Sequence, residues 1–414
     1  MEKAFRTKRL LFVIFAIIIS VLCTVCLVAC DGDDKNSGSR LKYSVMHDDK
    51  RNIISYRVDG IGSETGLDIV IPSNYKGKPV TRISESAFRG YGRITSVKIG
   101  NNVKHICANA FRDCVSLTSI EIPDSVTSIE NGAFENSAYY NDESNWENGV
   151  LYIGNHLISA KDTISGECTV KHDTLTIAEY AFYDCNSLTS VNMPDSVTSI
   201  GEGAFRGCGS LESAKMPDGI TSVGRKVFYN CANLTSIEIP TSVMFIEDYA
   251  FHGCSSLSGI EIPNSVLSIG DYAFRDCSSL TNIEIPDSVM LMGIEPFNNT
   301  EYFKNDSNWI DGVLYIGKHL ISAKTTISGE YTIRQGTLTI AGGAFYECSS
   351  LTNVYIPDSI VSVGDYVFLK CSLSSITFGG TMEHWQRRVA KALMWNDRFD
   401  SVKAVVCTDG TIEL

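Results

Sequence analysis

The segment AFRDCSSLTNIEIPDSV, residues 273–289, has a near-identical copy, AFRDCVSLTSIEIPDSV, at residues 110–126. The copies agree at 15 of 17 positions and lie 163 residues apart. In each copy two isoleucines flank a glutamate, and this alternation predicts a short strand with the isoleucines on one side and the glutamate on the other. The following proline lacks an N–H group and ends the strand.

Phenylalanines mark a period of 23 residues, interrupted by two steps of 48 residues. A fixed period in this range indicates a solenoid, in which equivalent residues stack in columns and successive strands lie about 4.8 Å apart. A single coil cannot bury its own apolar face, so each coil depends on its neighbours. The marker residues are Phe88, Phe111, Phe134, Phe182, Phe205, Phe228, Phe251, Phe274, Phe297, Phe345 and Phe368.

These patterns predict a β-rich repeat solenoid. Parallel strands should occupy one face, and short strands and helical turns the other, with a helical or 3₁₀ turn expected at Tyr249–Phe251. Two long repeats, about 135–181 and 298–344, should each contain a β-hairpin, and a small α/β cap should close the C-terminus.

Cysteines form a second column, three residues after the marker phenylalanines. Parallel side chains about 4.8 Å apart are farther apart than the Cβ atoms of a disulfide usually are, so we expect buried free thiols. A metal ladder is the alternative, and it would need several ligands converging on one ion. The residues are Cys114, Cys185, Cys208, Cys231, Cys254, Cys277, Cys348 and Cys371.

The long repeats contain VLYIGNHLISAKDTISGECT at 150–169 and VLYIGKHLISAKTTISGEYT at 313–332, which agree at 17 of 20 positions. Each should form a hairpin that extends the solenoid with extra strands. His156 and His319 occupy matching hairpin positions, where we expect exposed turn residues. Candidate insert-surface aromatics are Tyr139, Tyr140, Tyr302 and Phe303.

The two ends of the repeat array should differ from its middle, because terminal coils need caps. We predict an N-terminal cap at 41–81, the solenoid at 82–378 and a C-terminal cap at 379–414. In the C-terminal cap Trp385, Val389, Leu393 and Met394 recur near helical spacing, and 402–407 should form a final strand.

The N-terminus has the pattern of an export signal: a basic head, an apolar run and small residues before a cleavage point. Leu27-Val28-Ala29-Cys30 resembles the bacterial lipoprotein motif, which implies a signal peptide at 1–29 and lipid on Cys30. Residues 30–40 would then be an acidic flexible tether. An uncleaved membrane helix is the alternative, because the apolar run is long enough to span a bilayer.

The net charge is −13, and the +3 of the signal leaves −16 from Cys30 onward. An acidic body does not suit nucleic acid, which favours a basic surface. We therefore expect no nucleic-acid partner.

The phrases SLTSIEIPDSVTSI and AFxxC, with IPSNYKGKPVTRI before them and FGGTMEHW after them, resemble the BspA-like class of leucine-rich-repeat proteins. The resemblance covers about residues 41–414. It implies a parallel-strand solenoid on a microbial cell surface, where some members bind host matrix proteins or other cells.

No sequence pattern of a known catalytic or cofactor site is present, so we expect neither an enzyme nor a cofactor. The outward row of the strand face is the candidate binding surface, since solenoids bind partners on such faces. A solvated polar strand face is the alternative. Its candidate residues are Glu121, Asn192, Lys215, Glu238, Glu261, Glu284 and Tyr355, in a row that also includes Lys98 and Thr377.

We therefore predict a lipid-anchored surface protein that acts as a recognition or adhesion scaffold for protein partners on host or other cells. A structural or carbohydrate-binding envelope protein is the alternative, with any glycan expected at the insert aromatics. A hydrolase with a site assembled on the inserts is a third hypothesis.

Overall fold

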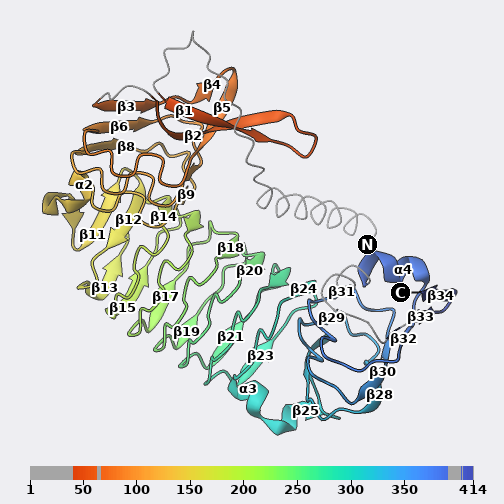
Figure 1. Ribbon diagram of the computed structural model, residues 1–414. Coiled ribbons are helices and arrows are strands. Elements are labelled where there is room, and N and C mark those ends of the chain that lie inside the picture. The colour runs from red at the N-terminus through yellow and green to blue at the C-terminus, as the bar shows by residue number, and fades with distance from the viewer. Residues whose placement is uncertain (1–40, 63–66, 390–401, 403, 414) are drawn as a thin grey trace. The chain divides into compact units, whose positions relative to one another are not determined.

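A computed structural model describes residues 41–62, 67–389, 402 and 404–413 (Figure 1). The predicted signal, Cys30, the tether, Leu393 and Met394 lie outside the described residues. Within the described ranges, no helix has the length and apolar character needed to cross a membrane. The chain divides after Asn145 into two compact units, which are described separately.

The first unit contains two sheets. In the larger sheet β1 pairs antiparallel with β2, and β2, β5, β7 and β9 then follow in parallel, with β4 beside β5. In the smaller sheet β3, β6 and β8 are parallel. The elements are β1 (Leu41–His47), β2 (Ile53–Ile61), β3 (Asp68–Ile71), β4 (Asn74–Tyr75), β5 (Lys78–Ile83), β6 (Ser96–Ile99), β7 (His105–Ile106), β8 (Ser119–Glu121), β9 (Ser128–Ile129), α2 (Ala138–Asn141) and the 3₁₀ turn η1 (Glu143–Asn145).

The second unit begins with the first hairpin and continues as two rows of parallel strands (Figure 1). One row has the order β13-β15-β17-β19, followed by the pair β21-β23. The other row has the orders β14-β16 and β18-β20-β22-β24. The strands are β13 (Ser165–Thr169), β14 (Thr176–Ile177), β15 (Ser187–Asn192), β16 (Ser199–Ile200), β17 (Ser213–Lys215), β18 (Ser222–Val223), β19 (Ser236–Ile237), β20 (Phe245–Ile246), β21 (Gly259–Glu261), β22 (Ser268–Ile269), β23 (Asn282–Glu284) and β24 (Leu291–Met292).

Both long repeats contain the predicted hairpin, and each adds strands to the solenoid. Strands β10, β11 and β12 are antiparallel, and β12 then pairs in parallel with β14. The second repeat has the same order, because β25, β26 and β27 lead to β29 and β31. The elements are β10 (Trp146–Glu147), β11 (Val150–Ile153), β12 (His156–Ala160), α3 (Glu301–Lys304), η2 (Asp306–Asn308), β25 (Trp309–Ile310), β26 (Val313–Ile316), β27 (His319–Ala323), β29 (Thr339–Ile340) and β31 (Ser362–Val363).

The C-terminal part is a sheet with the order β28-β30-β32-β33-β34, beside the short helix α4. Trp385 and Val389 are buried there, as their helical spacing predicts, although α4 ends at Arg388. The elements are β28 (Gly329–Thr332), β30 (Leu351–Ile356), β32 (Ser375–Phe378), α4 (Met382–Arg388), β33 (Ala404–Cys407) and β34 (Gly410–Glu413).

The marker phenylalanines form the core, since each is at most 4% exposed. Rings of adjacent coils stack nearly parallel in each unit; Phe88 and Phe111 have centroids 4.9 Å apart, and Phe205 and Phe228 are 5.6 Å apart. Strand register follows the same period, with Ser96 opposite Ser119 and Ser213 opposite Ser236. The 23-residue repeat is therefore one coil of the solenoid.

The expected helical turn at Tyr249–Phe251 is wrong. This segment is a hydrogen-bonded turn, and Tyr249 has a φ of 58°, which is left-handed rather than helical. In every coil, the residue two before the marker phenylalanine has a positive φ. This left-handed residue prevents the segment from continuing as a helix.

The expectation that His156 and His319 are exposed turn residues is also wrong, because both are fully buried. Each starts the second strand of its hairpin, and its Nδ1 lies 2.8 Å from a threonine hydroxyl on the next strand, Thr176 or Thr339. A hydrogen bond to this hydroxyl satisfies a ring nitrogen and makes burial of the imidazole acceptable. The histidines therefore join each hairpin to the following coil.

Candidate recognition surface

The strand face of the second unit carries three glutamates on successive coils: Glu238, Glu261 and Glu284, here called the glutamate row. All three are exposed, while the isoleucines before them are buried. Glu261 and Glu284 are direct partners in the β21–β23 ladder, and Glu238 follows the last residue of β19. Among the described residues, none of the three has a cation within ion-pair distance. The row is thus a line of exposed negative charge without an ion-pair partner in the part of the chain that is described, and Lys215 occupies the equivalent position of the coil before Glu238.

The other predicted positions of this face differ in their contacts. Lys98 Nζ lies 2.6 Å from Glu121 Oε2 in the first unit, so those two charges offset each other. Lys215 is the ladder partner of Asn192, and its Nζ lies 3.7 Å from Asp195 Oδ1. The structure brings these pairs together, but their charges are largely compensated.

Tyr355 is half-buried and is the ladder partner of exposed Thr377. Its hydroxyl lies so close to Gly379 that a Cβ there would be 2.3 Å away. The tyrosine therefore fits over a glycine, and its ring is a less accessible candidate than the glutamates.

Hydroxyl side chains beside the glutamates bind the neighbouring coil. Thr235 Oγ1 donates to the Glu212 carbonyl at 3.2 Å, and Thr281 Oγ1 donates to the Ser258 carbonyl at 3.3 Å. These contacts fix the backbone next to the row, so the carboxylates project from a rigid surface. Side chains held on regular elements position a binding group more accurately than loops do.

The four insert aromatics, Tyr139, Tyr140, Tyr302 and Phe303, are half-buried and lie in α2 and α3. In the second long repeat, the Trp309 ring packs edge-on against Phe303 at 5.1 Å, and its Nε1 donates to the Phe303 carbonyl at 2.7 Å. Burial also raises the pKa of the Tyr302 hydroxyl. The aromatics of the second insert therefore contribute to its packing.

The column cysteines are free thiols, and all except half-buried Cys371 are buried. Most donate a hydrogen bond to the carbonyl of the marker phenylalanine in the preceding coil, as in Cys231 to Phe205 at 3.1 Å. Burial raises the pKa of Cys114 to about 11 and that of Cys185 to about 12. In the part of the chain that the structure describes, no group of three or more His, Cys, Asp or Glu could hold a metal ion. The column joins coils and offers no metal site there.

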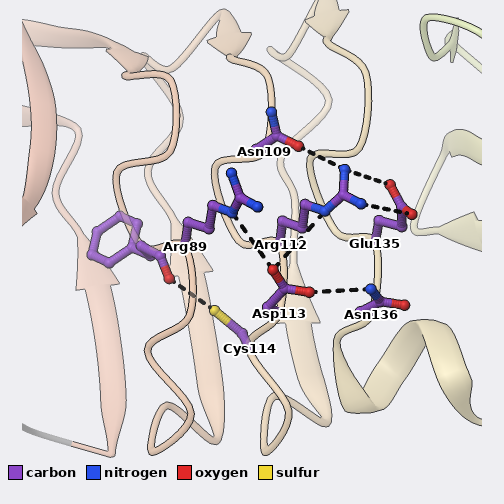
Figure 2. A network of polar contacts seen from close by, with 8 residues as sticks. Arg89, Asn109, Arg112, Asp113, Cys114, Glu135 and Asn136 are labelled. Atoms are coloured by element: carbon purple, nitrogen blue, oxygen red, sulfur yellow. Dashed lines mark hydrogen bonds and ion pairs between the residues drawn. The ribbon is translucent and has the colours of Figure 1, made fainter.

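The turns around the marker phenylalanines form a further surface that the sequence reasoning missed. Figure 2 shows it in the first unit, where Arg112 Nη1 lies 3.0 Å from Glu135 Oε2 and Arg89 Nε lies 3.5 Å from Asp113 Oδ2. Asn136 also donates to Asp113 at 3.1 Å. The sequence contains a signal for the Arg112–Glu135 ion pair, because these two residues are one 23-residue period apart.

A family model for the BspA type leucine rich repeat region matches six copies over residues 68–170, 175–304 and 310–390, which is most of the sequence. The chain belongs to this BspA-type leucine-rich-repeat family. The resemblance of the repeat phrases is thereby confirmed. Leucine-rich-repeat proteins are generally non-enzymatic scaffolds, and BspA-type members are typically exported or displayed on the cell surface.

Several solved structures resemble this BspA-type chain. A leucine-rich repeat protein from Bacteroides ovatus is 26% identical, with 83% of this chain and 84% of that chain covered and a TM-score of 0.34. A leucine rich cell surface protein from Faecalibacterium prausnitzii is 24% identical, with coverages of 82% and 77% and a TM-score of 0.30. The T. pallidum leucine rich repeat protein is 26% identical, with coverages of 53% and 89% and a TM-score of 0.29. No curated protein matches.

Proposed function

We propose that this BspA-type protein is an exported recognition scaffold, held at the membrane by lipid on Cys30, which binds a protein partner on its strand face. The glutamate row supports this proposal most directly, because it holds three exposed carboxylates without cationic partners on a rigid surface. Uncompensated charge of one sign favours a partner of the opposite sign and speeds its association. The partner is therefore a protein with a basic surface.

The lipid anchor is supported by the LVAC motif and the polar segment after it. One acyl chain binds a membrane only marginally, whereas two hold a protein stably. Mass spectrometry of the N-terminal peptide from cell membranes should show a cleaved, lipidated Cys30. A retained, unmodified N-terminus would support the membrane-helix alternative.

The binding test uses cells that display the full-length protein and a panel of soluble matrix proteins as probes. In the triple variant Glu238→Lys, Glu261→Lys and Glu284→Lys, the affinity for a basic probe should fall about tenfold or more, because attraction becomes repulsion. Binding by the unaltered protein should also weaken as salt rises, because salt screens exposed charges.

The matched control makes the same charge change at three exposed acids outside the row: Asp49→Lys, Glu85→Lys and Glu413→Lys. This control should retain most of the affinity. Equal loss in both triple variants would show that net charge, not this face, determines binding. Binding to a glycan array without binding to any protein probe would favour the carbohydrate alternative.

A further inference from the structure

The turns of the second unit carry a column of side chains, one residue after each of the five marker phenylalanines from Phe182 to Phe274. It consists of Tyr183, Arg206, Tyr229, His252 and Arg275, here called the turn-edge stripe. The Arg206 guanidinium lies 5.7 Å from the ring centroid of Tyr183 and 5.0 Å from that of Tyr229. The Tyr229 ring then stacks on His252 at 4.8 Å. Four successive coils thus form a continuous aromatic and cationic stack, and Tyr183 at its end is 46% exposed.

A second column, two residues before the marker phenylalanines, extends this surface. It contains Tyr180, Tyr249 and Tyr272, with φ values of 55°, 58° and 56°. The Tyr249 and Tyr272 rings stack at 5.0 Å, and the Arg275 guanidinium lies 5.2 Å from the Tyr272 ring. Aromatic side chains therefore recur in both columns, although Gly203 and Lys226 occupy the second column between Tyr180 and Tyr249.

These three tyrosines have a left-handed backbone conformation, which tyrosine seldom adopts. A positive φ is costly for a bulky residue and costs almost nothing for glycine. The same column holds glycine at Gly203, with a φ of 60°, so the turn itself does not require a tyrosine. Unfavourable backbone conformations often accompany functional sites, and this observation motivates a search for a ligand.

Arg206 differs from the arginines at the same position of other coils. Arg112 pairs with Glu135 at 3.0 Å, and Arg275 pairs with Glu295 at 2.6 Å. Among the described residues, Arg206 has no carboxylate within 4.0 Å. Its guanidinium lies between two tyrosine rings. The Tyr180 hydroxyl is a hydrogen-bond partner of this guanidinium, and the other N–H groups remain as a fork. This fork matches the geometry of a carboxylate.

We propose that the turn-edge stripe binds an acidic segment of a protein partner. The partner's carboxylate is held by Arg206, and an apolar or aromatic neighbour packs against the ring edges of Tyr183 and Tyr229. Tyrosine and arginine are the residues that most often dominate the energy of protein interfaces. This inference rests on the proposed recognition function and adds a second surface with the opposite charge preference.

The stacking favours a protein over a carbohydrate. A sugar ring packs on an open aromatic face, but the facing surfaces from Tyr183 to His252 are covered by their stacked neighbours. Ring edges, hydroxyl groups and the guanidinium fork remain for a ligand. Such groups suit side chains that insert between them and form hydrogen bonds.

The test uses the full-length protein in detergent micelles and a phage-displayed library of random dodecapeptides. Selected peptides should be enriched in Asp or Glu beside an aromatic residue. Their affinity should fall about tenfold or more in Arg206→Gln, because the partner's carboxylate then loses its charged partner. The matched control Arg89→Gln removes an arginine from the same position of a coil in the first unit and should leave the affinity unchanged.

A second variant separates binding from folding. Tyr249→Gly with Tyr272→Gly removes both rings while relieving the left-handed backbone, so the thermal midpoint should change little. Affinity for the selected peptides should nevertheless fall several-fold, because the Tyr249 and Tyr272 rings contact His252 and Arg275 of the stripe. A large drop in the thermal midpoint with unchanged peptide affinity would show that these tyrosines only stabilise the turns, and would overturn their part in binding.

The outcomes separate this inference from the proposed function. The inference would be overturned if acidic peptides bound Arg206→Gln with the same affinity as the unaltered protein. Binding of acidic oligosaccharides in place of peptides would also overturn it. The proposed function would survive either result if the charge reversals in the glutamate row still weakened a basic protein probe. If those charge reversals left the affinity for the basic probe unchanged while acidic peptides still required Arg206, only the strand-face proposal would be overturned.

Discussion

Cysteine shows how one residue type can fill the same position in most coils. Its thiol is small enough for the crowded interior, and it donates to the phenylalanine carbonyl of the preceding coil, at 3.1 Å for both Cys208 and Cys254. Serine could donate the same bond, but burying a hydroxyl costs more than burying a thiol, which behaves as a small apolar group. The column thus joins coils at little cost in desolvation.

Because burial raises the pKa of the Cys208, Cys231 and Cys254 thiols, we expect these three to be unreactive in the folded protein. A short pulse of iodoacetamide at pH 8, followed by peptide mass spectrometry, should leave Cys208, Cys231 and Cys254 unmodified, whereas half-buried Cys371 should react first. In concentrated urea all four should react quickly. Equal labelling of Cys231 with and without urea would contradict its place in the interior.

At the scale of elements, the hairpins of the long repeats depend on their buried histidines. Burial is the largest influence on His319 and lowers its pKa below the usual 6.5, with Lys318 acting in the same direction. The Pro286 carbonyl and Asp287 act in the opposite direction. The folded protein therefore favours the neutral ring at pH values where the unfolded chain has begun to take up a proton.

This preference predicts acid sensitivity. Since the unfolded chain binds more protons, the stability contributed by a neutral His319 is fully present above about pH 6.5 and is lost as the pH falls below it. Urea unfolding between pH 7 and 5 should show a shallower loss of stability in His319→Gln than in the unaltered protein. The control His172→Gln alters an imidazole that is 95% exposed and should leave the slope unchanged. An unaltered slope in His319→Gln would contradict the account.

The sequence predicts the strands and hairpins well for a physical reason. Ile-Glu-Ile alternation and the phenylalanine period depend on residues close together in the chain, and stacking multiplies the same choice in every coil. The burial of His319 depends on Thr339, which is 20 residues away in the sequence. The left-handed turns could not be predicted either, because tyrosine rarely adopts a positive φ and its presence does not indicate one. The cross-coil pair Arg112–Glu135 can be predicted from the sequence, because the two opposite charges are one 23-residue period apart.

At the scale of the molecule, the repeats separate stability from recognition. Phenylalanine, isoleucine and cysteine recur at the inward positions, so neighbouring coils share one interior in each unit. The residue type at the outward positions of the second unit varies between coils. Two different surfaces result, the glutamate row on the strand face and the turn-edge stripe on the turns. A solenoid tolerates such variation because each coil contacts only its neighbours.

The central claim is that 23 consecutive residues form one replaceable coil, and deletion tests it most directly. Removing residues 247–269 from the full chain brings Phe228 and Phe274 into the spacing of adjacent coils. Removing only residues 247–258 leaves the following coils out of register. Thermal unfolding followed by circular dichroism should show a cooperative transition, at a somewhat lower midpoint, for the first deletion and its loss for the second. A folded half-period deletion, or an unfolded whole-period deletion, would contradict the claim.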